Sequence, residues 1–176
     1  AWEAATGITF VRGAGAGADI TFDDNDSGAY ASSSVMGQSI ISSHVNIGTD
    51  WLGVYGTGYD SYSYQTYIHE IGHALGLGHA GNYDGSATYG VDNLYPNDSW
   101  QATVMSYFSQ ADNTRINASE AIVVSAMMAD IIAVQDLYGG APIRTGNNTY
   151  GIQTNAGPAY AVIAAMLGDT SRYDDI

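Results

Sequence analysis

Three of the chain's four histidines fall in one short segment that reads HEIGHALGLGH. His69 and His73 are four residues apart, and because an α-helix has about 3.6 residues per turn, both side chains project from one face. Two imidazoles on a helix leave a zinc site open, so a third ligand must come from elsewhere. Gly76 ends the helix and turns the chain, which lets His79 supply that ligand.

Glu70 follows the first of these histidines and points roughly 100° away around the helix. Three neutral imidazoles leave zinc its full positive charge and a free position for water, whose pKa falls towards about 7. Glu70 would take a proton from that water and pass it to the leaving amine of a peptide. The segment therefore predicts one catalytic zinc ion held by His69, His73 and His79, with Glu70 as general base.

The composition narrows the class of partner. Acidic residues number 18 against four basic ones, for a formal charge of −14, and cysteine is absent. Nucleic acids and anionic membranes attract positive surfaces, so we expect neither as a partner. No apolar run is long enough to span a bilayer, and no thiolate can act as ligand or nucleophile. The many aspartates either solvate the surface or bind calcium.

The rest of the chain reads as one compact domain with alternating strands and helices. Strands are expected at residues 8–12, 19–22, 29–35 and 43–47, a loop at 48–62, and helices at 63–75 and 118–138. Ser61 or Ser63 would cap the first helix, and Asn117 with Glu120 would form a capping box on the second. Asp130 is expected to bind a neighbouring backbone group. The long loop at 80–101 is expected to shape the substrate pocket.

The histidine segment and the later sequence Thr103-Val104-Met105-Ser106-Tyr107 together resemble the metzincin clan of zinc endopeptidases. That clan has HExxHxxGxxH followed by a methionine-containing turn. The resemblance implies that Met105 forms a hydrophobic floor beneath the imidazoles. Within the clan the chain is most similar to the serralysin family of secreted bacterial proteases, which share HEIGHALGL, Met-Ser-Tyr and a helix ending in Leu-Tyr-Gly. That likeness implies that Tyr107 binds zinc in the resting enzyme and steadies the tetrahedral intermediate.

The same resemblance implies an α/β (α+β) metzincin-type domain with a twisted, mostly parallel sheet, an active-site helix and a C-terminal helix. Residues 1–140 would form the catalytic domain, with an upper lobe to about residue 79 and a lower lobe after it. Protein substrates would bind in extended form beside the edge strand at 29–34. We expect secretion from a bacterium and a broad substrate range.

Residues 141–176 would be a C-terminal extension, at the junction to a calcium-binding domain. Arg144, Gly146 and Asn148 resemble the start of a family calcium site that uses backbone oxygens. The chain departs from the family in having Ala80-Gly81 where Pro-Gly is usual, and in lacking GGxGxDxUx repeats. We therefore expect a trimmed, processed or incomplete chain, which a further chain or domain could complete.

Two other readings stay open. An astacin-like or matrixin-like protease would share the zinc helix, although astacins carry cysteines and matrixins lack the tyrosine after the methionine. A zinc-dependent binding module without hydrolysis would keep the histidines, but it would leave Glu70 without a task.

Overall fold

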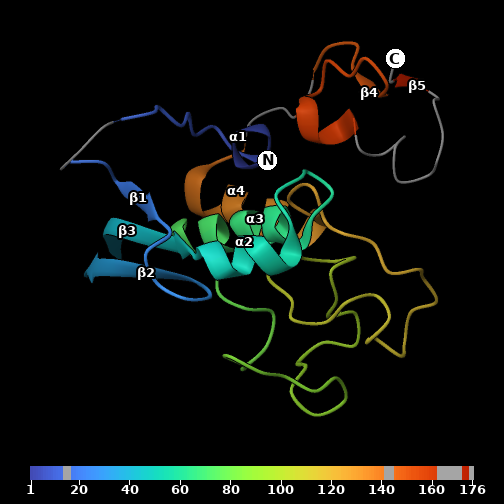
Figure 1. The fold of residues 1–176 in the computed structure, drawn as a ribbon, viewed down its shortest axis with the longest axis horizontal. Helices are drawn as coiled ribbons and strands as arrows, with labels where there is room; N and C mark the ends of the chain where they lie inside the picture. Colours follow the sequence, from blue (N-terminus) through green and yellow to red (C-terminus); the bar gives the residue numbers. More distant parts are fainter. Residues whose placement is uncertain (14–16, 141–144, 162–171, 175–176) are drawn as a thin grey trace.

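The computed structural model describes residues 1–13, 17–140, 145–161 and 172–174 (Figure 1). In chain order the elements are α1 (Trp2–Ala5), β1 (Ile20–Asp23), β2 (Ala29–Met36), β3 (Ser39–Ile47), α2 (Thr49–Tyr55), α3 (Tyr62–Ala74), α4 (Met128–Tyr138), β4 (Thr149–Gly151), η1 (Pro158–Ala161) and β5 (Arg172–Asp174). The result is a mixed α/β domain. Among the described residues, no helix has the length and apolar character needed to cross a bilayer.

The larger sheet has the order β1-β3-β2, with β2 at an edge as the sequence predicts. β1 pairs with β3 in parallel, whereas β2 pairs with β3 antiparallel. The expectation of a mostly parallel sheet is thus wrong for the described strands. β2 ends at Met36 and β3 begins at Ser39, and a connection this short, through Gly37, can join only antiparallel neighbours. β4 and β5 form a separate antiparallel pair.

The strand expected at residues 8–12 is absent from the structure, although these residues are described. Backbone N–H groups that a neighbouring strand would bind are taken by side chains instead. Ile8 N donates to Thr6 Oγ1 at 3.1 Å, and Phe10 N donates to Glu3 Oε1 at 2.7 Å. Local side-chain acceptors therefore compete with sheet pairing here.

Helix α3 lies at the centre of the molecule, between the sheet and α4 (Figure 1). It begins where predicted, because Ser61 Oγ accepts a hydrogen bond from Tyr64 N at the N-cap. It ends after Leu75, where Gly76 adopts φ +97°, a conformation that favours glycine.

Two helix boundaries differ from expectation. Residues 49–55, expected as loop, form α2, in which Trp51 packs on Tyr55 and Tyr62 with ring centroids 4.5 and 6.0 Å apart. Residues 118–127, expected as the first half of a long helix, are not helical. Instead, Val123 N donates to Gln65 Oε1 at 2.7 Å, so the capping box at Asn117 does not form and α4 begins at Met128.

The core consists of two apolar clusters on opposite sides of α3. The larger, towards α4, comprises Trp2, Ala5, Ile68, Leu75, Leu77, Trp100, Val104, Met105, Val123, Ala126 and Val134. The smaller, towards the sheet, comprises Val45, Ile47 and Ala74. Because both clusters hold α3, the residues that α3 carries on its remaining face are rigidly positioned.

Candidate metal centre

The three histidines of the sequence motif converge on one point. His73 Nε2 lies 3.0 Å from both His69 Nε2 and His79 Nε2, and the latter two nitrogens are 3.3 Å apart. Ligand nitrogens about 2.0–2.1 Å from a tetrahedral zinc ion lie roughly 3.3 Å from one another, so the spacing suits that ion. Among the described residues, these three are the group of acidic and histidine side chains able to hold a metal together.

The hydrogen bond made by Nδ1 of each histidine determines which ring nitrogen is free to bind a metal. Nδ1 lies 2.8 Å from Val104 O in His69, 2.8 Å from Leu77 O in His73 and 2.7 Å from Tyr83 O in His79. A carbonyl oxygen only accepts, so each Nδ1 must carry the proton and each Nε2 presents a lone pair. Three lone pairs facing one another repel unless a cation lies between them. The donor set therefore fits zinc.

Burial keeps the helical histidines neutral. Removal from water lowers the pKa of His69 to about 3, against the opposing effect of the bond to Val104 O. Burial likewise lowers the pKa of His73, again opposed by its carbonyl partner, Leu77 O. A neutral imidazole is the form that binds a metal, so the fold prepares these two side chains for coordination at neutral pH.

Glu70 borders the cleft beside the histidines. This cleft has a volume of about 480 Å³, and its walls include Glu70, His69 and Tyr107. The Glu70 side chain is only 7% exposed. Burial raises its pKa to about 7, and a hydrogen bond from the Ala31 backbone acts in the opposite direction. A carboxyl group with a pKa near neutrality can both take up and release a proton at neutral pH.

The turn around Met105 packs against α3. Met105 is 2% exposed, and its Sδ would lie 2.6 Å from a Cβ built on Gly72, so it packs directly under α3. Asp130 of α4 anchors this turn, accepting from Thr103 Oγ1 at 2.5 Å, Val104 N at 2.9 Å and Met127 N at 2.8 Å. The prediction that Asp130 binds neighbouring backbone is confirmed.

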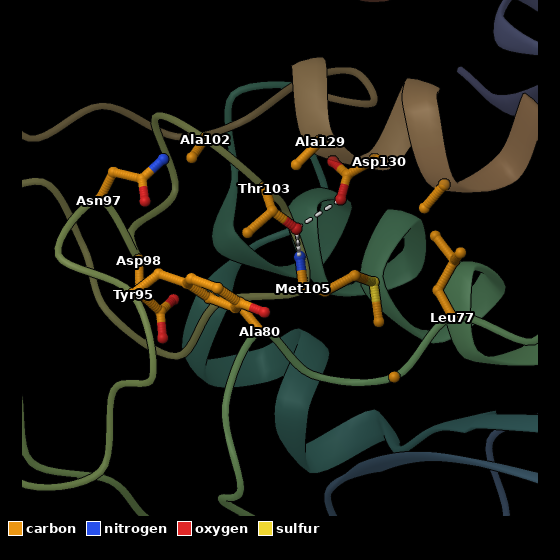
Figure 2. A pocket seen from close by; sticks show the side chains of 12 residues that line it. Leu77, Ala80, Tyr95, Asn97, Asp98, Ala102, Thr103, Met105, Ala129 and Asp130 are labelled. Carbon is orange, nitrogen blue, oxygen red and sulfur yellow. Dashed lines mark hydrogen bonds between the residues drawn. The ribbon is translucent and has the colours of Figure 1, made fainter.

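Thr103, Met105 and Asp130 of this anchor also line a second cavity of about 350 Å³ (Figure 2). Met105 and Leu77 form one side of that cavity, and Asp98 and Tyr95 form the other. The histidines do not line it. It is therefore distinct from the cleft that holds Glu70.

Tyr107 lies beside the histidines, as the sequence suggests. Its ring centroid is 4.5 Å from that of His79 and 6.1 Å from that of His69. The Tyr107 hydroxyl accepts a hydrogen bond from Gly85 N at 3.3 Å. Burial raises the pKa of Tyr107, so the phenol keeps its proton at neutral pH.

Comparison with known proteins now bears on this arrangement. A family model described as metallopeptidase family M12B, reprolysin-like, matches residues 4–132. The chain belongs to this family. The matched stretch contains all three histidines, Glu70, Met105 and Tyr107.

Named relatives agree with this membership. Serralysin C of Dickeya chrysanthemi is 40% identical over 102 residues, covering 56% of this chain and 21% of that protein. The metallopeptidase AprA of Pseudomonas marginalis is 42% identical over 106 residues, covering 56% and 22%. The metalloprotease AprA of Pseudomonas entomophila is 42% identical over 108 residues, covering 57% and 22%. The chain is a serralysin-like metzincin protease domain, and the match spans about a fifth of these relatives.

The calcium prediction for this metallopeptidase domain is untested. Arg144 lies outside the described residues. Asn148 Nδ2 donates to Gly146 O at 2.7 Å, which brings these two residues of the expected site together. Calcium binding at this place stays a prediction.

Sequence reasoning missed Tyr83, which contacts His79 at the metallopeptidase site, and Asp98, which contacts Tyr83. Tyr83 supplies the carbonyl for His79, and its hydroxyl lies 3.2 Å from both Asp98 carboxylate oxygens. Both residues lie in a loop rich in tyrosine and aspartate, where no spacing marks these two. They are distinguished only by their burial in the folded structure, where Tyr83 is 6% exposed and Asp98 is 2% exposed.

Proposed function

We propose that this chain is the catalytic domain of a secreted, zinc-dependent endopeptidase that hydrolyses peptide bonds in proteins. The supporting observation is the convergence of three Nε2 lone pairs beside a cleft that Glu70 also lines. Membership in a metallopeptidase family supports the same activity. The names of the relatives, serralysin and metalloprotease, support a bacterial protease.

His69, His73 and His79 would hold the zinc ion through Nε2. When bound, zinc polarises the scissile carbonyl and acidifies water in the same site. Glu70 accepts the proton of the attacking water as its oxygen bonds to the carbonyl carbon. As the carbon–nitrogen bond breaks, Glu70 returns that proton to the leaving nitrogen. A pKa raised by burial suits a group that must do both.

Tyr107 would bind zinc in the resting state and support the oxyanion during hydrolysis. Its oxygen accepts from Gly85 N, which leaves the phenolic proton available to donate. A donor aimed at the developing negative charge stabilises the tetrahedral intermediate more than the substrate. Met105 would keep the floor beneath the imidazoles apolar and rigid.

The substrate would lie extended beside β2. This strand is at the edge of the sheet, and Ser27, Gly28 and Ala29 at its start line the cleft. The Ala31 backbone hydrogen-bonds to Glu70, so this part of β2 faces the catalytic carboxylate. Pairing through backbone atoms alone tolerates many side chains, which accords with a broad substrate range.

The test is digestion of an unfolded protein substrate by the zinc-loaded chain. A chelator should abolish activity, and added zinc should restore it. Glu70→Gln should lower kcat by about 10²–10⁴-fold, because the amide cannot accept the proton, while zinc content stays unchanged. Glu120→Gln is a matched control, because Glu120 is exposed and away from the cleft. It should leave the rate unaltered.

Three outcomes would contradict parts of this proposal. Activity that survives the chelator would exclude a metal mechanism. Undiminished activity in Glu70→Gln would remove Glu70 as the base. Tight zinc binding without any hydrolysis would favour the zinc-dependent binding module instead.

The pH dependence follows from the role of Glu70. A general base works only when ionised, so kcat/KM should fall as the pH decreases through the Glu70 pKa. Burial raises that pKa, which moves the acid limb to higher pH than an exposed glutamate would give. Glu70→Gln should remove the acid limb from whatever activity remains.

A further inference from the structure

The third histidine is held differently from the first two. The carbonyl partners of His69 and His73 are themselves tied to fixed elements: Val104 N binds Asp130, and Leu77 N binds Gly72 O of α3 at 3.0 Å. His79 lies after the helix, and its partner is the carbonyl of Tyr83 in an irregular loop. The orientation of the His79 ring therefore depends on what fixes Tyr83.

Tyr83 makes four contacts at the metal site through three of its groups. Its carbonyl accepts from His79 Nδ1 at 2.7 Å, and its ring stacks on the His79 ring at 5.4 Å and 26°. Its hydroxyl accepts a long hydrogen bond, 3.4 Å, from Tyr107 N. Its ring also lies 4.8 Å from the Tyr107 ring. One side chain thus touches both the third histidine and the proposed oxyanion donor.

The Tyr83 side chain is held in turn by Asp98. The phenolic O–H lies 3.2 Å from each Asp98 oxygen, so its single proton is shared between them. Asp98 is 2% exposed, and a buried carboxylate requires a hydrogen-bond donor. The two distances are longer than those of an ordinary O–H···O hydrogen bond, but this shared contact is the one that holds the buried end of the Tyr83 side chain to Asp98.

Asp98 itself is fixed by backbone contacts. Asn113, which is 1% exposed, donates to the carbonyls of Asp98 and Pro96 at 3.1 and 3.0 Å. A Cβ on Gly81 would lie 2.5 Å from the Tyr83 ring, so the loop also closes tightly over that ring. Hydrogen bonds therefore connect Asn113 to His79 through the buried residues Asp98 and Tyr83.

We propose that Tyr83 and Asp98 are a positioning pair that sets the orientation of His79 towards the metal and of Tyr107 towards the substrate. Neither residue touches the reacting atoms; both act through His79 and Tyr107. The inference rests on the proposed zinc peptidase function. It adds that the loop at residues 80–101 controls metal retention and turnover through this one buried hydrogen bond.

The test uses Tyr83→Phe, which removes the hydroxyl and keeps the ring and the carbonyl. Loss of a group that orients a metal ligand typically weakens metal binding about 10–100-fold. We expect zinc to leave the Tyr83→Phe protein for a chelator about ten times faster than wild type. At saturating zinc, kcat should fall about fivefold with KM within about twofold, since Tyr107 is misplaced but the substrate edge is intact.

Asp98→Asn and the double variant make the test specific to the pair. Asp98→Asn should change both quantities in the same direction, because a neutral amide oxygen accepts more weakly. If the two residues act as a unit, the double variant should be no worse than Tyr83→Phe alone. Fully additive losses would overturn the pairing.

Tyr89→Phe is the matched control. Tyr89 lies in the same loop and donates through its hydroxyl to Pro96 O at 2.7 Å, with its ring against Phe108. It should leave zinc release and kcat at the wild-type values. Equal losses in Tyr89→Phe and Tyr83→Phe would mean general loosening of the loop and would overturn the proposal.

Failure of this inference is distinguishable from failure of the proposed function. If wild type binds zinc and hydrolyses peptides while Tyr83→Phe and Asp98→Asn match it, only the positioning pair is refuted. If wild type neither holds zinc nor hydrolyses peptides, the proposed function fails, and this inference fails with it. Unfolding of the metal-free proteins provides the structural check. Tyr83→Phe should be less stable than Tyr89→Phe there, because it leaves the buried Asp98 carboxylate without its donor. Zinc release and kcat are therefore compared at a temperature at which every variant is fully folded.

Discussion

The metal centre is built from two regions that achieve order by different means. Helix α3 carries His69 and His73, and its order comes from regular backbone hydrogen bonds and a capped start. The segment from residue 80 to residue 110, which carries the partners of His79 and ends near Tyr107, contains no helix or sheet strand. Yet several of its polar side chains are almost fully buried, among them Asp98, Ser99 and Ser106.

In the loop region, side-chain hydrogen bonds and isolated backbone hydrogen bonds replace the regular backbone hydrogen bonds of a helix. Trp100 is held twice, through its backbone N to Phe108 O at 2.9 Å and through Nε1 to Ser106 O at 3.0 Å. Asp130 and Asn113 each bind several backbone groups. The comparison shows that the helical half is stabilised by many weak local interactions, mainly backbone hydrogen bonds. The loop half is stabilised by a few buried polar residues. Single substitutions should therefore damage the two halves unequally.

The largest effect on stability is expected from Asp130→Ala, which removes the α4 side chain that anchors the loop half. This change leaves the hydroxyl of Thr103 and the backbone N–H groups of Val104 and Met127 without their acceptor. Buried unsatisfied groups cost about 1–3 kcal/mol each, with partial relief by relaxation, so we expect a loss of roughly 3 kcal/mol. Denaturant unfolding measures it. Asp136→Ala, exposed on the same helix, should change stability by less than about 0.5 kcal/mol.

A loss in Asp130→Ala no larger than that in Asp136→Ala would break the comparison, because it would mean that the turn at Met105 holds without its buried anchor. If Asp130→Ala also greatly weakened zinc binding, the result would show that the loop half controls the metal centre as well as stability, because the carbonyl partner of His69 lies in the same turn.

An intermediate effect is expected where the two regions meet, at Gly72. A Cβ there would lie 2.6 Å from Met105 Sδ and 3.1 Å from Trp2 Cζ2, so Gly72→Ala must shift the buried Met105 side chain. Overpacking of this kind costs about 1–3 kcal/mol, which exceeds the helix-propensity gain of alanine, and we expect a net loss of roughly 1–2 kcal/mol. Thermal unfolding measures it.

Gly53→Ala provides the control for Gly72→Ala. Gly53 is also helical, in α2, and a Cβ there meets nothing within 4 Å. That variant should gain up to about 1 kcal/mol from helix propensity. If both glycine variants were stabilised, the contact between α3 and the turn would be looser than the structure indicates.

The smallest effect is expected at the start of α3. Ser61→Ala removes the acceptor for Tyr64 N and the donor to Gly58 O, and loss of an N-cap costs about 1 kcal/mol. Zinc affinity should be unchanged, because the histidines lie more than a turn further along the helix. Unfolding with and without zinc checks both statements. Ser34→Ala, exposed on β2, is the control. A loss in Ser61→Ala as large as that in Asp130→Ala would remove the proposed difference between the halves.

Much of the helical half was predictable from the sequence. The spacing of His69 and His73, the cap at Ser61 and the exit at Gly76 each follow from local geometry, and the structure confirms them. β1, β2 and β3 were likewise located, because runs of β-branched and aromatic residues are also a local signal. The roles assigned to these residues in catalysis stay proposals.

The two errors in helix placement share one physical cause. Residues 118–127 have a helical pattern, but Gln65 and Gln110 bind their backbone at Val123 and Ala121 and hold them extended. Residues 49–55 look like loop, but packing of Trp51 against the aromatic rings beside α3 makes a helix of them. In each case contacts between residues distant in sequence outweighed local propensity.

The sequence by itself determined the metal-binding helix, its boundaries and the family, because neighbouring residues on a helix fix one another's directions. Only the tertiary structure decided how His79 is oriented and which of 14 tyrosines and several loop aspartates matter. Tyr83 and Asp98 are 15 residues apart and joined by a single buried hydrogen bond. No local pattern encodes such a bond, because it exists only once the loop has folded against the helix.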